Sequence, residues 1–163
     1  MALSLLIYED NELLRESIVS MISLNKQFRV GGAFNNVLKV EDQIKSLQPD
    51  FILMDIDMPG RSGIEAVSRV RTAGWSTPIL MLTVFDDNQH VFDAICAGAS
   101  GYLLKKHLSS KLYNSIEELQ NGGAPMSPSI ARMVISSMHK KQTPVNPYGL
   151  TGRETDVLTS LSK

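Results

Sequence analysis

Short apolar runs alternate with segments of helical period along the first 120 residues. Continuous apolar strands separated by amphipathic helices are typical of a parallel sheet that helices cover on both faces. Right-handed crossovers then bring every strand end to the same edge of the sheet. We therefore expect an α/β domain of five βα units, with strands at Leu3–Tyr8, Phe28–Phe34, Phe51–Asp55, Ile79–Thr83 and Gly101–Leu104.

Capping and stop residues delimit the predicted helices. Asn11 is a predicted N-cap of the first helix, and Ser62 of the third. We expect Ser109 or Ser110 to cap the fifth helix. Pro49 stops the second helix, whose apolar positions are Val37, Val40, Ile44 and Leu47.

Composition places the chain among ordinary soluble globular proteins, with 43% hydrophobic and 20% charged residues in 163. No apolar run approaches the length of a membrane span, and the acidic N-terminus does not resemble a signal peptide. A single cysteine, Cys96, excludes an internal disulfide and indicates a cytoplasmic location.

The net charge of −1 is unevenly distributed along the chain, because residues 125–163 carry five basic and two acidic side chains. This basic tail is a candidate nucleic-acid contact or an ordinary solvated linker.

Reactive side chains stand at four of the predicted strand ends. Glu9 and Asp10 follow the first strand, Asp55 ends the third, Thr83 the fourth, and Lys105 follows the fifth. Carboxylates that meet at one edge repel one another unless a cation lies among them, and Mg²⁺ is the small hard cation that suits such ligands. A lysine and a hydroxyl beside that metal suit phosphoryl oxygens. The residues therefore predict a Mg²⁺-dependent site for phosphoryl transfer onto an aspartate.

The same residues, with the segment Asp55–Gly63 (DIDMPGRSG), resemble the receiver domain of two-component response regulators. The resemblance covers residues 1–123 and implies a flavodoxin-like fold with strand order 2-1-3-4-5. It implies that Asp55 is the phospho-acceptor and that Asp10 and Asp55 are the carboxylate ligands of Mg²⁺. Glu9 is then the ligand that acts through water.

The resemblance implies three further roles, one of which the residues themselves already indicate. The backbone carbonyl of Asp57 would be the protein's third metal ligand. Thr83 and Lys105 would hold the phosphoryl oxygens, and Thr83 would act with Tyr102 as the switch pair, the aromatic ring turning inward as the threonine moves.

The sequence departs from the usual receiver pattern at two places. Lys106 stands after Lys105 where many receivers have a proline with a cis bond. A cis bond without proline costs roughly 3–4 kcal/mol, so either isomer stays open here. Asp57 and Phe85 occupy the variable positions that tune dephosphorylation, and the sign of their net effect stays open.

The tail after Gly123 has a different character. Ser127-Pro128 predicts a helix start, and residues 124–149 are interpreted as a helical linker. Residues 150–163 include a capping box, Thr151 to Glu154. The string LTGRETDVL resembles the opening of a LuxR-type helix-turn-helix domain, of which only the first helix is present. The segment GGAPMSP, residues 122–128, resembles the join that precedes that domain in NarL/FixJ-type regulators. Without a recognition helix we expect no specific DNA binding by this chain alone.

The resemblance implies a response regulator rather than an enzyme, with self-phosphorylation and autodephosphorylation as its only chemistry. Its implied partners are a sensor histidine kinase, a second copy in a phosphorylation-dependent homodimer, and DNA only through a complete C-terminal domain. Two alternatives stay open. One is a stand-alone receiver that acts as an interaction module or phosphate sink without DNA binding. The other is a small Mg²⁺-dependent phosphatase, for which the sequence offers no second nucleophile.

Overall fold

The computed structural model describes residues 2–84 and 88–142. Its five parallel strands form one sheet in the order β2-β1-β3-β4-β5, which confirms the predicted flavodoxin-like topology. The strands have the predicted bounds: β1 Leu3–Tyr8, β2 Phe28–Phe34, β3 Phe51–Asp55, β4 Ile79–Thr83 and β5 Gly101–Leu104. The helices are α1 Glu12–Ser23, α2 Val40–Leu47, α3 Gly63–Thr72, α4 Asn88–Ala97, the 3₁₀ turn η1 Lys105–His107, α5 Leu108–Gln120 and α6 Pro128–Gln142.

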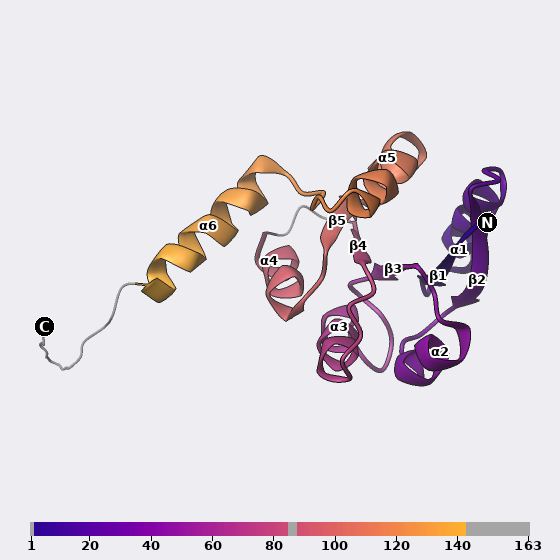
Figure 1. The fold of residues 1–163 in the computed structure, drawn as a ribbon, viewed down its shortest axis with the longest axis horizontal. Helices are drawn as coiled ribbons and strands as arrows, with labels where there is room; N and C mark the ends of the chain where they lie inside the picture. The colour runs from indigo at the N-terminus through magenta and orange to yellow at the C-terminus, as the bar shows by residue number, and fades with distance from the viewer. Residues whose placement is uncertain (1, 85–87, 143–163) are drawn as a thin grey trace, which may run out of the picture. The chain divides into compact units, whose positions relative to one another are not determined.

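Helices cover both faces of the sheet (Figure 1), as the continuous apolar strands require. Successive side chains of a strand point to opposite faces, so each strand feeds two cores. On one face, Leu5 and Leu53 belong to a buried cluster with Ile18 of α1 and Ile116 of α5. On the other face lie α2, α3 and α4. Strands β1, β3 and β4 are buried along nearly their whole length. Because these strands are held in the core, the residues at their carboxyl ends have fixed positions.

Two predicted helix starts are wrong. The apolar spacing places Val37 on helix α2, but the helix begins at Val40. Val37 is buried from the preceding loop, which explains why it fits the apolar pattern. Neither Ser109 nor Ser110 caps α5; the 3₁₀ turn η1 leads directly into the helix, and the Ser110 hydroxyl donates to the carbonyl of His107 at 3.3 Å. The other two N-caps are confirmed: Asn11 accepts from the amide of Leu14, and Ser62 accepts from that of Glu65.

The described chain divides between Ser127 and Pro128 into two units. The predicted helix start at Ser127-Pro128 is confirmed, since α6 begins at Pro128. The predicted beginning of a helix-turn-helix domain at 150–163, including the capping box, lies outside the described residues. Within the described ranges 2–84 and 88–142, no helix combines the length and apolar character that crossing a bilayer demands.

Candidate phosphoryl-acceptor site

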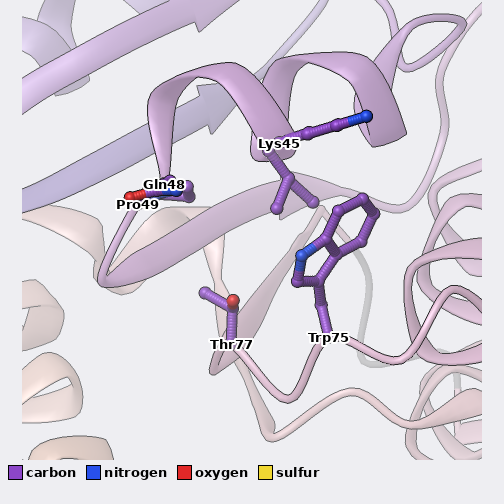
Figure 2. Close-up of a pocket in the computed structure, with 6 residues that line it drawn as sticks. Lys45, Gln48, Pro49, Trp75 and Thr77 are labelled. Carbon is purple, nitrogen blue, oxygen red and sulfur yellow. The ribbon is translucent and has the colours of Figure 1, made fainter.

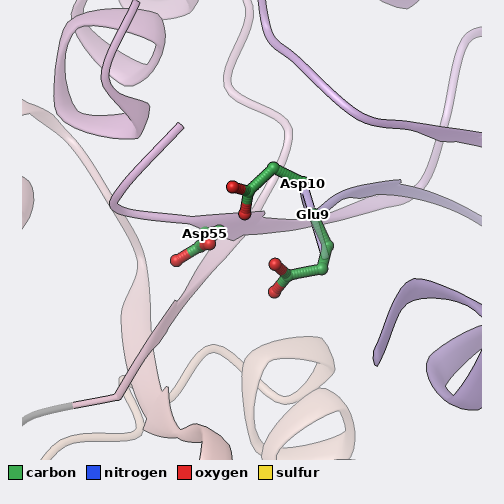
Figure 3. Close-up of side chains that lie close together, drawn as sticks. All are labelled: Glu9, Asp10 and Asp55. Atoms are coloured by element: carbon green, nitrogen blue, oxygen red, sulfur yellow. The ribbon is translucent and has the colours of Figure 1, made fainter. Parts of the chain in front are cut away.

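Three carboxylates meet at the carboxyl edge of the sheet (Figure 3). Ligand oxygens of Glu9, Asp10 and Asp55 all lie within 4.8 Å of one another. Glu9 is fully buried and Asp55 is 4% exposed, whereas Asp10 is open to solvent. Parallel strands β1 and β3 are neighbours, so their ends bring these residues together, as the sequence predicts. Two buried carboxylates and one open one fit a hard divalent cation such as Mg²⁺ that keeps part of its water shell.

Lys105 supplies the positive charge of the site. Its Nζ lies 2.8 Å from Oε1 of Glu9 and 3.0 Å from Oδ2 of Asp55. Burial alone would lower the pKa of Lys105, but the hydrogen bonds to Glu9 and Asp55 outweigh it and raise that pKa. The ammonium group therefore stays charged at neutral pH. Oε1 of Glu9 has no other hydrogen-bond partner within the described residues, so one lysine serves two buried carboxylates.

One cation leaves the charge balance incomplete. Burial raises the pKa of Asp55 to about 7, with a further contribution from the charge of Glu9, although the Lys105 hydrogen bond acts in the opposite direction. A positive charge placed nearby would stabilise the ionised form of Asp55, which burial disfavours. The direction of this pKa shift agrees with the clustering of the carboxylates, and both favour a metal cation here.

The backbone around Glu9 is fixed by α1. The amide of Asn11 donates to Oε2 of Glu9 at 3.1 Å, and Asn11 also caps α1 through its side chain. Arg15, one turn along α1, donates to the carbonyl of Glu9 at 2.8 Å. The start of the helix thus holds both the side chain and the main chain of Glu9. No sequence pattern identifies Arg15, because a hydrogen bond from a long side chain to a main-chain carbonyl requires no particular spacing of residue types.

A close approach of backbone fixes Asp55. The amide of Gly63 donates to the carbonyl of Ile56 at 2.8 Å, closing the loop between β3 and α3. A Cβ on Gly63 would lie 2.1 Å from the carbonyl oxygen of Asp55, so only glycine fits. Within this loop the amide of Asp57 donates to Oδ1 of Asp55 at 3.3 Å, while the Asp57 side chain is exposed. The two aspartates are therefore in different environments.

The remaining predicted residues flank this cluster. Thr83 ends β4, is 7% exposed, and follows the residue that pairs with Asp55 in the sheet. Tyr102 is 6% exposed, and its hydroxyl accepts a hydrogen bond from the amide of Ser127 at 3.2 Å. The prediction for Phe85 lies outside the described residues.

Comparison with known proteins agrees with this geometry. Residues 5–117 match the response regulator receiver domain family. The chain belongs to that family. It is 34% identical to the transcriptional regulatory protein DesR of Bacillus subtilis over 96% of this chain and 73% of that protein.

Two solved structures extend the likeness. A two-component response regulator of the LuxR family from Aurantimonas sp. SI85-9A1 is 26% identical with a TM-score of 0.75, covering 85% of this chain and 99% of that one. The signal receiver domain of the putative response regulator NarL of Mycobacterium tuberculosis is 27% identical with a TM-score of 0.70, covering 74% of this chain and 98% of that one. The chain is thus a two-component receiver domain whose relatives are NarL/LuxR-type regulators.

A separate hollow lies where α2 ends and the chain approaches β4, at the amino-terminal ends of the strands. Figure 2 shows the residues around it. Its cavity measures about 320 Å³. The residues that line it come from the end of α2 and from the segment before β4, and are Ile44, Lys45, Gln48, Pro49, Trp75 and Thr77. None of the predicted site residues contributes to it, so it is distinct from the acidic cluster.

Proposed function

We propose that this receiver takes a phosphoryl group on Asp55 from a sensor histidine kinase. An Oδ oxygen of Asp55 forms the new bond to phosphorus, and the bond from phosphorus to the donor's imidazole nitrogen breaks, leaving the histidine free. The observation that carries the proposal is the ion pair between Lys105 Nζ and Asp55 Oδ2 at 3.0 Å, inside a cluster of three carboxylates. Thr83 and Lys105 hold the phosphoryl oxygens during and after transfer.

The metal has a defined place in this scheme. Asp10 and Asp55 would hold Mg²⁺ directly, with Glu9 acting through water and Asp57 through its carbonyl. At these residues a bound Mg²⁺ would supply positive charge to balance the phosphoryl oxygens. Lys105, shared between Glu9 and Asp55, lies beside the oxygen of Asp55 and is therefore placed to contact a phosphoryl group there.

The output follows from contacts of Tyr102. Its amide donates to the carbonyl of Pro125 at 2.9 Å, and its hydroxyl accepts from Ser127. Both partners lie just before α6. Because phosphorylation adds about −1.5 to −2 charges next to Thr83, rearrangement of Thr83 and Tyr102 would alter the surface formed by α4, β5 and α5. The same change would loosen the segment that leads toward the C-terminus.

The transcriptional role is the finer part of the proposal. The relatives' names, such as transcriptional regulatory protein DesR, support regulation of transcription through a C-terminal DNA-binding domain. Phosphorylation would then control dimerisation of this cytoplasmic protein and the availability of that domain. A receiver that works without DNA binding remains the second candidate.

Intact mass spectrometry tests the chemistry. We expect the wild-type protein, incubated with Mg²⁺ and acetyl phosphate, to gain one phosphoryl group, and Asp55→Ala to gain none. Asp57→Ala is the matched control, because it removes the neighbouring exposed carboxylate and keeps the backbone carbonyl. An unmodified wild-type protein, or an adduct that persists in Asp55→Ala, would refute the proposal.

A further inference from the structure

Arg61 connects the loop that follows Asp55 to the neighbouring helix α2. Its guanidinium donates to the carbonyl of Val37 at 3.3 Å and lies 3.4 Å from Glu41 Oε1 and 3.6 Å from Glu65 Oε2. The side chain is 16% exposed, although it starts from a surface loop. A single residue of the loop therefore contacts the β2–α2 loop, α2 and α3 at once.

Arg69 provides an internal comparison. It pairs with the same two carboxylates, at 3.5 Å from Glu41 Oε2 and 3.6 Å from Glu65 Oε2. Arg69 starts from the last turn of α3, however, and is 47% exposed. Its backbone is already fixed by the helix, so its ion pairs join α3 to α2 and do not attach to the loop directly.

Among the described residues, the outer part of the loop has few other contacts, although Ser62 at its end caps α3. Residues 56–62 form no regular secondary structure. The hydrogen bond from Gly63 to Ile56 closes its base. Farther out, Leu38 packs over Gly60, with Leu38 Cδ2 3.3 Å from the position of a Cβ there. Arg61 and this contact both join the outer loop to the segment 37–41.

We propose that Arg61 is a positioning residue for the acceptor site. Through Val37 and Glu41 it holds the Ile56–Ser62 loop so that the Asp57 carbonyl stays at the position from which it serves the metal. This inference rests on the proposed function, since it assigns Arg61 to the same metal site. Supporting residues around a metal commonly change its affinity by 10–100-fold when they are removed.

The direction of the change in Mg²⁺ affinity distinguishes a positioning role of Arg61 from a purely electrostatic one. Arg61→Gln removes a positive charge near an acidic site, and by Coulomb attraction alone this change would tighten Mg²⁺ binding. If Arg61 positions the Ile56–Ser62 loop, the same substitution weakens Mg²⁺ binding. Arg69→Gln also removes one positive charge and two ion pairs to Glu41 and Glu65, but it leaves the contacts of Arg61 with the loop's surroundings in place, so it is the matched control.

The experiment measures Mg²⁺ affinity by titration calorimetry and amide hydrogen exchange of residues 56–62 in the whole chain. We expect Arg61→Gln to raise the Mg²⁺ dissociation constant about 10-fold and to speed exchange in the loop. We expect Arg69→Gln to change both by less than about twofold. Phosphorylation by acetyl phosphate at fixed Mg²⁺ should slow in Arg61→Gln and recover when Mg²⁺ is raised.

Three results would overturn the inference in distinguishable ways. Unchanged or tighter Mg²⁺ binding in Arg61→Gln, with a wild-type protein that is phosphorylated, refutes positioning and leaves the proposed function intact. Equal weakening in both variants assigns the effect to the ion network and refutes a role specific to the loop. A wild-type protein that binds no Mg²⁺ and takes no phosphoryl group refutes the proposed function, and this inference with it.

Discussion

Replacing Asp55 by asparagine should stabilise the metal-free protein. The carboxylate is 4% exposed, and burial raises its pKa from 3.8 to about 7. A tenfold change in the proton affinity of a side chain on folding corresponds to about 1.4 kcal/mol, so the ionised carboxylate destabilises the fold by at most roughly 4 kcal/mol at neutral pH. Asparagine keeps the size and removes the charge, and the pKa of about 7 already includes the opposing effect of the Lys105 ion pair. We therefore expect a gain of about 2–4 kcal/mol in the free energy of unfolding.

Urea unfolding in the presence of EDTA measures this gain. The folded-state pKa lies above the unfolded one, so the wild-type penalty is absent below about pH 4, grows up to about pH 7 and is constant above it. The advantage of Asp55→Asn should thus be less than half as large at pH 5 as at pH 7. Asp57→Asn, at an exposed position, should change stability by less than about 0.5 kcal/mol.

Equal stability of Asp55→Asn and wild type at pH 7, or a gain that does not vary with pH, would refute the reasoning. Magnesium gives an independent check. Ligand binding to the folded state raises stability by RT ln(1 + [Mg²⁺]/Kd). Added Mg²⁺ should therefore stabilise the wild type more than Asp55→Asn and narrow the difference between them.

Two other substitutions test other parts of the molecule. Arg71→Met should lower the free energy of unfolding by about 2–4 kcal/mol, because the guanidinium donates to the carbonyls of Trp75, Thr77 and Gly98 at 2.8–2.9 Å; chemical denaturation checks this, and a loss below about 1 kcal/mol would contradict it. Tyr102→Phe should speed amide exchange at Ser127 by removing its acceptor, as deuterium uptake would report; unchanged protection there would show that the hydroxyl does not hold this segment.

Strands β1, β3 and β4 were predictable because burial on both faces restricts nearly all their positions to apolar residues. A run such as Phe51–Asp55 can only be apolar until it reaches the edge, where the first charged residue marks its end. The convergence of Glu9, Asp55 and Lys105 followed from strand parallelism alone. Fold and cluster thus depend on a pattern that the sequence carries directly.

Helix starts depend on competing local contacts that periodicity does not resolve. Val37 fits the apolar spacing of α2 yet belongs to a loop, where the Asn36 side chain accepts from the amide of Leu38. Ser110 has the chemistry of an N-cap, but its hydroxyl bonds back to His107.

The supporting arginines were not predictable for a different reason. Arg15 and Arg61 reach main-chain carbonyls, and the position of a carbonyl is set by the fold and not by residue type. Sequence patterns therefore identify the residues that form the site more readily than the residues that hold the site in place.

Trp75 gives the protein an optical reporter that is well separated from its chemistry. It is the single tryptophan of the chain and lines the hollow at the amino-terminal edge of the sheet. A strand of five residues spans roughly 16 Å, so the indole stands at the far end of β4 from Thr83. Direct quenching by a group on Asp55 is excluded at that separation. Any change of emission on phosphorylation would therefore record a rearrangement transmitted along the length of the sheet, and a silent indole would confine that rearrangement to the carboxyl edge.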